Sequence, residues 1–208
     1  MINRLEVYET RGASAPLLFW RTKMALGDPT LYKGYLGGHM WITHTDKGSL
    51  QYMIDNFGIK TMLDVGCGPG GQVRVAKELG LDAEGVDGDV RLIEENTDIT
   101  IYECDFTQNT FEKEVDLIWS VEFVEHVDEK YQENYMKTFA KAKHVILTFA
   151  PPGKAGIHHV NCKPAQYWIE TFEKYGFAHS ERITQNIRTA TTMEREFIRR
   201  NGLYFTKK

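Results

Sequence analysis

The chain of 208 residues is long enough to bury the core of one α/β domain, and its 42% hydrophobic and 26% charged residues are typical of a globular protein. A formal net charge of −4, with Lys and Arg spread along the chain, argues against a dedicated nucleic-acid-binding protein but leaves a local basic patch open. Because no apolar run approaches about 18 residues and the first residues lack the hydrophobic region of a signal peptide, we expect a cytoplasmic protein without a membrane span.

The first part of the chain, residues 1–45, shows no sustained hydrophobic period. It is rich in aromatic residues and glycine, and it precedes the first clear core strand. We therefore expect a capping segment that packs over the ligand edge or the side of a sheet. A layer of core aromatics and a lid that gates the substrate both stay open for this segment.

Periodic structure begins at Asp46. Four apolar residues at helical spacing predict an amphipathic helix that ends at Gly58, namely Leu50, Met53, Ile54 and Phe57. Apolar runs further along predict strands at 60–65, 83–86, 99–103, 115–119, 144–149, 177–183 and 203–206. Helices are expected near 71–79, 129–141, 164–175 and 191–200. This alternation predicts one α/β domain over 46–208, a doubly wound seven-stranded and mostly parallel sheet with one antiparallel strand at its edge and helices on both faces.

A glycine-rich turn follows the first core strand, in the stretch LDVGCGPGG. Gly66, Gly68 and Gly71 fit GxGxxG, the dinucleotide fingerprint, while Asp64, Gly66, Gly68 and Gly70 fit D-x-G-x-G-x-G. The acid distinguishes the two patterns, because Asp64 would repel a pyrophosphate but not a ligand that carries an ammonium group. The second pattern resembles motif I of the class I, Rossmann-like, S-adenosylmethionine-dependent methyltransferases.

That resemblance implies S-adenosyl-L-methionine bound across the carboxyl ends of the first three strands. The turn would contribute Asp64, Gly66, Cys67, Gly68 and Gly70. Asp87, with Gly88 beside it, stands 21 residues after Gly66 at the end of the next strand, where a carboxylate accepts hydrogen bonds from a ribose diol. NAD carries the same ribose, so Asp87 supports an adenosine ligand without choosing between the two cofactors.

Two further segments follow strand ends. In the family, an acid at the position of Asp105 accepts from the adenine amino group and a neighbour such as Phe106 walls the ring, although a turn-capping Asp is a competing interpretation. Residues 120–126 resemble the family's S-x-E-x-x-E-H segment. Ser120 and Glu122 would there lie beside the reactive end of the cofactor. His126 is either a base or, as is more common for a histidine in this segment, a structural residue.

The loop after the fifth strand carries His158 and His159. An imidazole titrates near neutral pH, so either residue is a candidate catalytic base for an acceptor hydroxyl, and simple anchoring of the loop is the alternative. His39 and His44 are weaker candidates. Adjacent histidines also suggest a metal site. We expect no metal, because no nearby Asp or Glu supplies a third ligand and the three cysteines lack the spacing of a zinc site.

Together these patterns predict a methyltransferase that uses S-adenosyl-L-methionine. The acceptor is not encoded in any motif. A small-molecule or sugar-like hydroxyl is expected, because no basic patch or added recognition domain is visible, while nucleic-acid and protein acceptors stay open. An NAD-binding oxidoreductase and a silent adenosine-binding module are the competing functions.

Overall fold

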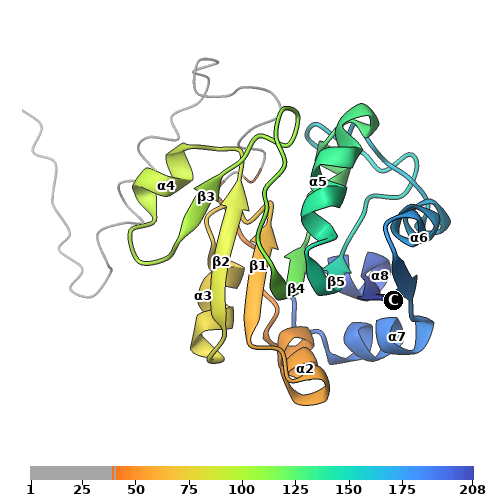
Figure 1. The fold of residues 1–208 in the computed structure, drawn as a ribbon, viewed down its shortest axis with the longest axis horizontal. Helices are drawn as coiled ribbons and strands as arrows, with labels where there is room; N and C mark the ends of the chain where they lie inside the picture. Colours follow the sequence, from red (N-terminus) through yellow and green to blue (C-terminus); the bar gives the residue numbers. More distant parts are fainter. Residues whose placement is uncertain (1–38, 40) are drawn as a thin grey trace, which may run out of the picture. The chain divides into compact units, whose positions relative to one another are not determined.

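One seven-stranded sheet forms the centre of the computed structural model, which describes residues 39 and 41–208 (Figure 1). Its strands are β1 (Thr61–Val65), β2 (Asp82–Asp87), β3 (Ile101–Glu103), β4 (Val115–Ser120), β5 (Ala142–Leu147), β6 (Phe177–His179) and β7 (Leu203–Lys207). Their order in the sheet is β3-β2-β1-β4-β5-β7-β6. Most of the expected capping segment, residues 1–38 and 40, lies outside the described residues, so its role stays a prediction.

Strand directions confirm a mostly parallel sheet with one antiparallel strand. The first five strands pair in parallel, and β7 pairs antiparallel with both β5 and β6. The expectation that the antiparallel strand lies at the edge is wrong, because β7 inserts between β5 and β6 and leaves β6 at the edge. Leu203 pairs with Leu147 on one side of β7, while Lys207 pairs with Phe177 on the other.

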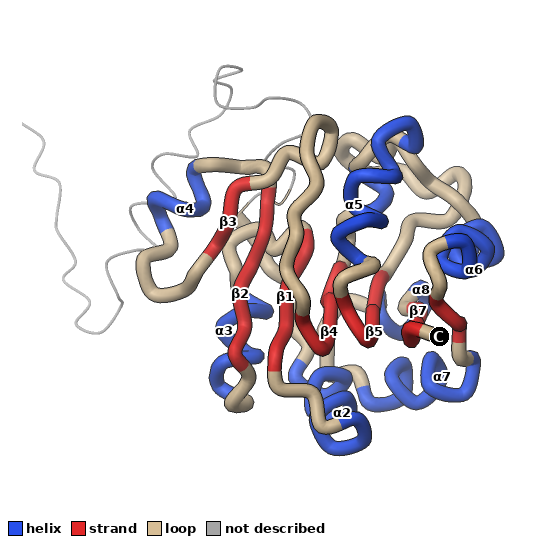
Figure 2. Tube along the Cα trace, in the orientation of Figure 1, coloured by secondary structure: helices blue, strands red, loops and turns tan. Residues whose placement is uncertain are grey.

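Helices cover both faces of the sheet (Figures 1 and 2). They are α2 (Lys47–Phe57), α3 (Gly71–Glu78), α4 (Arg91–Glu95), α5 (Gln132–Phe139), α6 (Ala165–Lys174), α7 (Glu181–Ala190) and α8 (Phe197–Asn201), with 3-10 helices η1 (Val124–His126) and η2 (Glu129–Tyr131). Neighbouring residues of β1 face opposite cores, as strand geometry requires. Leu63 packs in the layer of α5 and α6, and Met62 packs in the layer of α2, α3 and α7.

The end of the chain departs from the sequence prediction. The expected strand 177–183 stops at His179, and the following residues form α7, which was not expected. The helix expected near 191–200 is present only as the short α8 at its end. Ser180 caps α7 by accepting a hydrogen bond from the backbone N–H of Ile183. Ile183 and Ile187, one helical turn apart, are both buried in the layer that contains α2, and this burial fixes the helical conformation.

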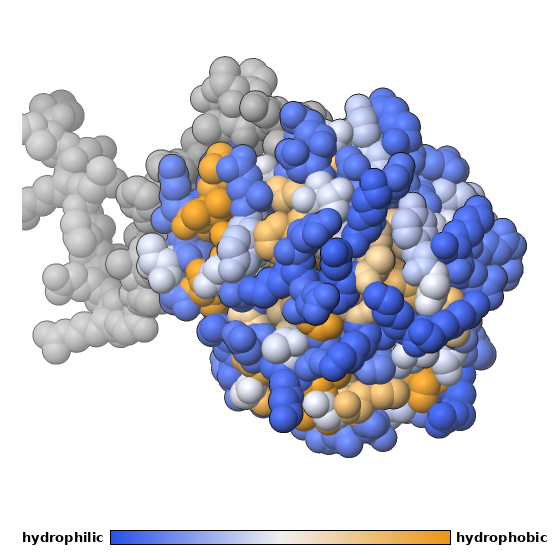
Figure 3. All heavy atoms as spheres, viewed as in Figure 1, coloured by the Kyte–Doolittle hydropathy of each residue, from blue (hydrophilic) through white to orange (hydrophobic). Residues whose placement is uncertain are grey.

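The face drawn in Figure 3 is mainly hydrophilic. Apolar atoms gather near α4, where Val90 and Ile93 are 49% and 39% exposed. Within the described part of the chain, none of the helices combines the length and the apolar character that crossing a membrane requires.

The functional site lies where the strand order of the sheet reverses direction, between β1 and β4. From β1 the chain passes outward to β2 and β3, and it then returns to place β4 on the other side of β1. The segments that leave β1 and β4 therefore diverge at the carboxyl ends of two neighbouring strands. Open α/β sheets bind their ligands at such a switch point.

Candidate functional site

A cavity of about 310 Å³ opens at this switch point. Most of the residues expected from sequence line it, together with several histidines: Asp64, Gly66, Cys67, Gly68, Asp87, Gly88, Asp105, Phe106, Glu122, His39, His44, His126, His158 and His159. The fold therefore brings residues from six separate segments to one place.

The glycine turn forms one wall of the cavity with bare backbone. Gly66 and Gly68 adopt φ values of +77° and +49°, in the left-handed region that favours glycine. The Gly66 N–H donates to the Val86 carbonyl (2.9 Å) and ties the turn to β2. A Cβ on Gly66 would lie 2.5 Å from the Phe123 ring, and one on Gly68 would lie 3.0 Å from Cβ of His39. Gly66 thus requires glycine for space as well as for conformation, whereas Gly68 requires it mainly for conformation.

Gly70 serves a different purpose from these two glycines. It is the N-cap residue of α3, with φ +73°, and a Cβ there would meet Ile99 at 2.2 Å. Packing against Ile99 and the start of α3 therefore account for this glycine. Its expected contact with the cofactor stays a prediction.

Two ionisable side chains lie buried under the turn. Asp64 is only 3% exposed, and burial together with the neighbouring Asp87 raises its pKa to about 8. Burial also raises the pKa of the Cys67 thiol, and the carboxylates of Asp87 and Asp64 add to that effect. The thiol is therefore protonated at neutral pH, and the carboxyl group of Asp64 is poised to respond to a cation.

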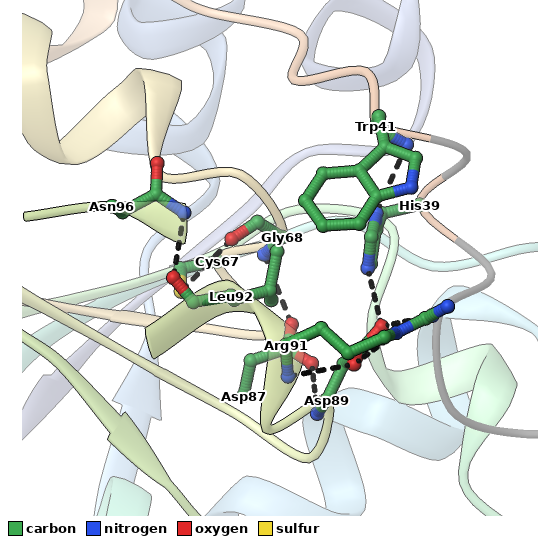
Figure 4. A network of polar contacts seen from close by, with 9 residues as sticks. All are labelled: His39, Trp41, Cys67, Gly68, Asp87, Asp89, Arg91, Leu92 and Asn96. Carbon is green, nitrogen blue, oxygen red and sulfur yellow. Dashed lines mark hydrogen bonds and ion pairs between the residues drawn. The ribbon is translucent and has the colours of Figure 1, made fainter. Parts of the chain in front are cut away.

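Asp87, at the end of β2, is held in place by backbone donors (Figure 4). Its Oδ2 accepts from the Gly68 N–H (2.9 Å) and its Oδ1 accepts from the Asp89 N–H (3.0 Å). Burial raises its pKa, and these hydrogen bonds together with His39 oppose that rise. The carboxylate is thus oriented toward the cavity before any ligand binds.

A second layer of contacts supports this arrangement (Figure 4). Asp89 accepts hydrogen bonds from His39 Nε2 (3.1 Å) and Arg91 Nε (2.7 Å). Nδ1 of His39 accepts from the Trp41 N–H (3.0 Å), so the ring hydrogen is on Nε2. Both nitrogens of His39 are therefore engaged, and the residue positions Asp89 and the turn. A general base would need a free ring nitrogen.

Asp105 and Phe106 line the cavity beyond β3. Asp105 Oδ1 accepts from the N–H and the hydroxyl of Thr107 (2.8 and 2.7 Å), and Oδ2 accepts from Gln108 (2.8 Å). The turn-capping interpretation of Asp105 is thus realised, and its contact with adenine stays a prediction. The buried Phe106 ring lies 5.4 Å from that of Phe123 and supplies an apolar wall.

The segment after β4 adds a strained acid. Ser120 is fully buried, and its hydroxyl donates to the Val65 carbonyl (3.1 Å), which joins β4 to β1 at the switch point. Glu122 adopts φ +54°, a conformation that typically costs a non-glycine residue about 1–3 kcal/mol. Its N–H donates to Thr148 Oγ1 (2.8 Å), and burial raises the pKa of its carboxyl group.

Beside Glu122 lies a cluster that the sequence analysis missed. Possible ligand atoms of Glu125, His126 and His159 all lie within 4.8 Å of one another. The expectation that no acid lies near the histidines is therefore wrong. The loop after β5 folds onto η1, where the N–H groups of Val160 and Asn161 donate to the Glu125 carbonyl (2.9 and 3.1 Å).

The three histidines at this end differ in their surroundings. Burial, with His159 and His158 nearby, lowers the pKa of His126 to about 4, so its ring is neutral. His159 Nδ1 donates to the Lys154 carbonyl (3.1 Å), which anchors the loop. His158 has φ +52° and lines the cavity. Of the weaker candidates, His44 lines the same cavity and contacts the Phe197 ring.

Comparison with known proteins identifies the family. Residues 47–207 match the family model described as "Methyltransferase domain". The comparison with curated proteins finds no match.

Three similar solved structures are the sugar N-methyltransferase KedS8 from Streptoalloteichus sp ATCC 53650, a TehB-like SAM-dependent methyltransferase from Corynebacterium glutamicum ATCC 13032, and magnesium protoporphyrin IX methyltransferase from Synechocystis PCC 6803 with bound SAM. For KedS8 the TM-score is 0.58 at 12% identity, over 100% of this chain and 98% of the other. For the TehB-like protein the TM-score is 0.55 at 19% identity, over 77% of this chain and 88% of the other. For the magnesium protoporphyrin IX methyltransferase the TM-score is 0.56 at 16% identity, over 94% of this chain and 92% of the other. These likenesses establish the fold.

The residues at the switch point also fit the cofactor of this family. The turn leaves bare backbone that a Cβ at Gly66 or Gly68 would obstruct, a buried acid lies beneath it, and an oriented carboxylate stands at the end of β2. The family model covers most of the chain. The chain therefore belongs to the methyltransferase-domain family and is an S-adenosylmethionine-dependent class I methyltransferase.

Proposed function

We propose that this methyltransferase modifies a hydroxyl group of a small polar acceptor. The observation that carries the proposal is a second cavity of about 330 Å³, which shares Glu122, His159 and Phe197 with the first. Two cavities that meet at these side chains give the cofactor and the acceptor separate sites with a common boundary. Methyl transfer requires such an arrangement, because the two reacting atoms must approach in line.

The wall of the second cavity favours a small polar acceptor. Its basic residues are Lys154, Arg195 and Arg200, and its acidic residues are Glu122, Glu194 and Glu196. This balance of charge supports recognition of hydroxyl and other neutral polar groups. Nucleic-acid binding instead depends on a surplus of positive charge that neutralises phosphates.

Cofactor binding is proposed to follow the chemistry of each residue in the first cavity. Asp87 accepts from the ribose hydroxyls, Asp105 and Phe106 hold the adenine, and Asp64 lies beneath the methionine end. Ser120 and Glu122 border the reactive end. When bound, S-adenosylmethionine supplies a methyl group on a positively charged sulfur, which is already activated for transfer.

We assign the role of base to His158, which lines the first cavity. His159 is the anchoring residue, because its Nδ1 is bound to the Lys154 carbonyl. His158 would take the proton from the acceptor hydroxyl as the O–CH₃ bond forms and the S–CH₃ bond breaks, with the electron pair left on the sulfur of S-adenosylhomocysteine. An amine acceptor would not need this base.

The test combines product identification with one pair of variants. The purified chain is incubated with labelled S-adenosylmethionine and small hydroxyl-bearing and amine-bearing compounds, and the products are identified by mass spectrometry. With the hydroxyl acceptor, His158→Ala should lower kcat by about 100- to 10,000-fold, the usual contribution of a positioned base, while cofactor affinity stays unchanged.

The matched control is His179→Ala. His179 lies on the edge strand β6 and bonds Thr184 Oγ1 (3.1 Å), away from both cavities. Its removal should leave kcat within about twofold. Turnover by His158→Ala at the parent rate, or methylation of amines alone, would contradict the proposal of a hydroxyl acceptor.

A further inference from the structure

We propose that Glu125, His126 and His159 bind a divalent transition-metal ion at the acceptor side of the cavity. Nothing in the binding of S-adenosylmethionine calls for such an ion, so this site goes beyond the methyl-transfer function. Three features of the cluster carry the inference: the convergence of its ligand atoms, the unsatisfied carboxylate of Glu125, and the anchoring of the His159 ring.

The ligand atoms lie close to coordinating distance. One carboxylate oxygen and two imidazole nitrogens all fall within 4.8 Å of one another. In a tetrahedral site with bonds of 2.0–2.1 Å, ligand atoms are about 3.3 Å apart. Small side-chain rotations therefore suffice to close the cluster around an ion.

The buried carboxyl group of Glu125 has no hydrogen-bond partner among the described residues. The residue is 0% exposed, and neither Oε1 nor Oε2 has a hydrogen-bond partner among the described residues. An isolated buried carboxylate is costly, because the lost solvation is not replaced. The carboxyl group of Glu122 lies beside that of Glu125, so two acidic side chains share one buried place. A divalent cation satisfies this arrangement directly.

His159 is oriented as metal-binding histidines are. Its Nδ1 bonds the Lys154 carbonyl, which can only accept, so Nδ1 carries the hydrogen and Nε2 keeps its lone pair. A Cβ on Gly156 would lie 2.1 Å from that Nε2. Gly156 therefore packs against the His159 ring, and any side chain at that position would displace the ring.

Main-chain hydrogen bonds fix the two halves of the cluster to each other. The carbonyl of Glu125 accepts from Val160 and Asn161, the two residues that follow His159. The rings of His126 and His159 meet edge to face, with centroids 5.0 Å apart. The ligands are thus preorganised across two segments that are far apart in sequence, which lowers the entropic cost of binding an ion.

The donor set indicates the class of metal. Two imidazole nitrogens and one carboxylate suit Zn²⁺ and other first-row divalent ions, whereas Mg²⁺ and Ca²⁺ prefer oxygen ligands. Three protein ligands leave at least one coordination position open. His159 borders both cavities, so the open position is available to the acceptor hydroxyl, which a metal ion would make more acidic. This role, unlike the site itself, rests on the proposed function.

Direct metal titration tests the site without cofactor or acceptor. The full chain is stripped with EDTA and titrated by calorimetry with CoCl₂, ZnCl₂ or MgCl₂. We expect one equivalent of Co²⁺ or Zn²⁺ to bind at least tenfold more tightly than Mg²⁺. Bound Co²⁺ should also show the visible absorption of a four- or five-coordinate ion, and either metal should raise the melting temperature.

Two variants and one control sharpen the test. His159→Ala and Glu125→Gln should each weaken Co²⁺ binding by at least about 100-fold and abolish the metal-dependent rise in melting temperature. Glu125→Gln keeps the size of the buried side chain, so it still tests metal binding if His159→Ala folds poorly. His44→Ala removes a histidine of the same cavity outside the cluster and should bind Co²⁺ like the parent.

A parent chain that binds neither Co²⁺ nor Zn²⁺ would overturn the proposal, and so would variants that bind them with parent affinity. Because the titration uses metal alone, either result leaves the assignment of the acceptor untouched. Conversely, metal binding that depends on Glu125 and His159 supports the site even if the acceptor proves to be an amine.

Discussion

The two ends of the cavity differ in how their buried polar groups are satisfied. At the end formed by β1 and β2, Asp87 accepts two backbone N–H groups and Asp89 holds both His39 and Arg91. At the end formed by β4 and β5, both oxygens of Glu125 and Oδ1 of Asn161 have no partner among the described residues. The carboxylates of Asp87 and Asp89 at the first end therefore have partners within the protein, whereas that of Glu125 at the second end has none among the described residues.

Under the proposed function, this difference separates the binding of the cofactor from the binding of the acceptor. A cofactor that every turnover uses is best bound by groups that are already oriented, because reorganisation would cost affinity. The acceptor end must instead pair its polar groups with a ligand. Glu122 and His158 adopt left-handed φ values at that end, while Trp41 (φ +59°) adopts the same conformation at the first end.

Gly66→Val should abolish measurable cofactor binding. The side chain would force φ +77° on a β-branched residue and overlap the Phe123 ring, each of which costs roughly 1–3 kcal/mol. Gly80→Val is the matched control, since Gly80 has φ +86° but a Cβ there would meet no atom within 4 Å. Calorimetry with S-adenosylhomocysteine should show loss for Gly66→Val alone. Equal affinities in the two variants would mean that the turn does not shape the site.

Asp87→Ala should weaken cofactor binding by about 1.5–3 kcal/mol, or roughly 10- to 150-fold, the scale for hydrogen bonds to a charged group. Glu125→Gln, at the other end of the cavity, should leave this affinity within about twofold. Calorimetry on both variants measures the contrast. If Asp87→Ala binds like the parent, the ribose lies elsewhere and the first end has been misassigned.

Asp116→Ala gives a reference for a satisfied carboxylate outside the cavity. Lys143 lowers the pKa of Asp116 to about 2, and the N–H groups of Lys60 and Thr61 contribute. Its stabilising effect is therefore complete above pH 4 and is lost as the pH falls through about 2. We expect the variant to lose about 1–3 kcal/mol in urea unfolding at pH 7 and less at pH 2.5, with unchanged cofactor affinity. A loss that did not depend on pH would exclude the ionic contribution.

The smallest effect concerns pH and cofactor affinity. Asp64, with a pKa of about 8, is mostly protonated at pH 7 in the free chain, and the cationic methionine end favours its ionised form. Affinity for S-adenosylmethionine should therefore rise by up to about tenfold between pH 6.5 and 8.5, with release of a proton on binding. Calorimetry in buffers of different ionisation enthalpy measures that proton. Asp64→Asn should remove the dependence, and a parent affinity that is flat with pH would contradict this role.

The sequence predicts the arrangement around the glycine turn better than the cluster of Glu125, His126 and His159 for a physical reason. At the first end, the strand, the glycine turn and the acid are adjacent in the chain, so local conformation almost determines the site. The cluster of Glu125 and His159 depends on a loop that folds back onto η1 through bonds to Val160 and Asn161. Such long-range main-chain pairing leaves no periodic pattern in the sequence.

The C-terminal errors have a similar origin. Residues 181–190 contain β-branched Ile and Thr, which favour strands, and only Ile183 and Ile187 mark a buried helical face. Ser180 as a helix cap was the local clue to α7. The insertion of β7 between β5 and β6 cannot be inferred from order along the chain, because an antiparallel pair accepts a partner on either edge.

The position of β7 also constrains how the sheet is assembled during synthesis. Residues 177–179 are made first, yet they pair only with residues 203–207 and not with β5. At about 5–20 residues per second, the nascent chain waits a few seconds for that partner. Throughout this interval β5 presents an unpaired edge, which is a template for association with other chains. A ribosome that pauses before residue 203 would thus leave a chain with β5 unpaired and prone to aggregation.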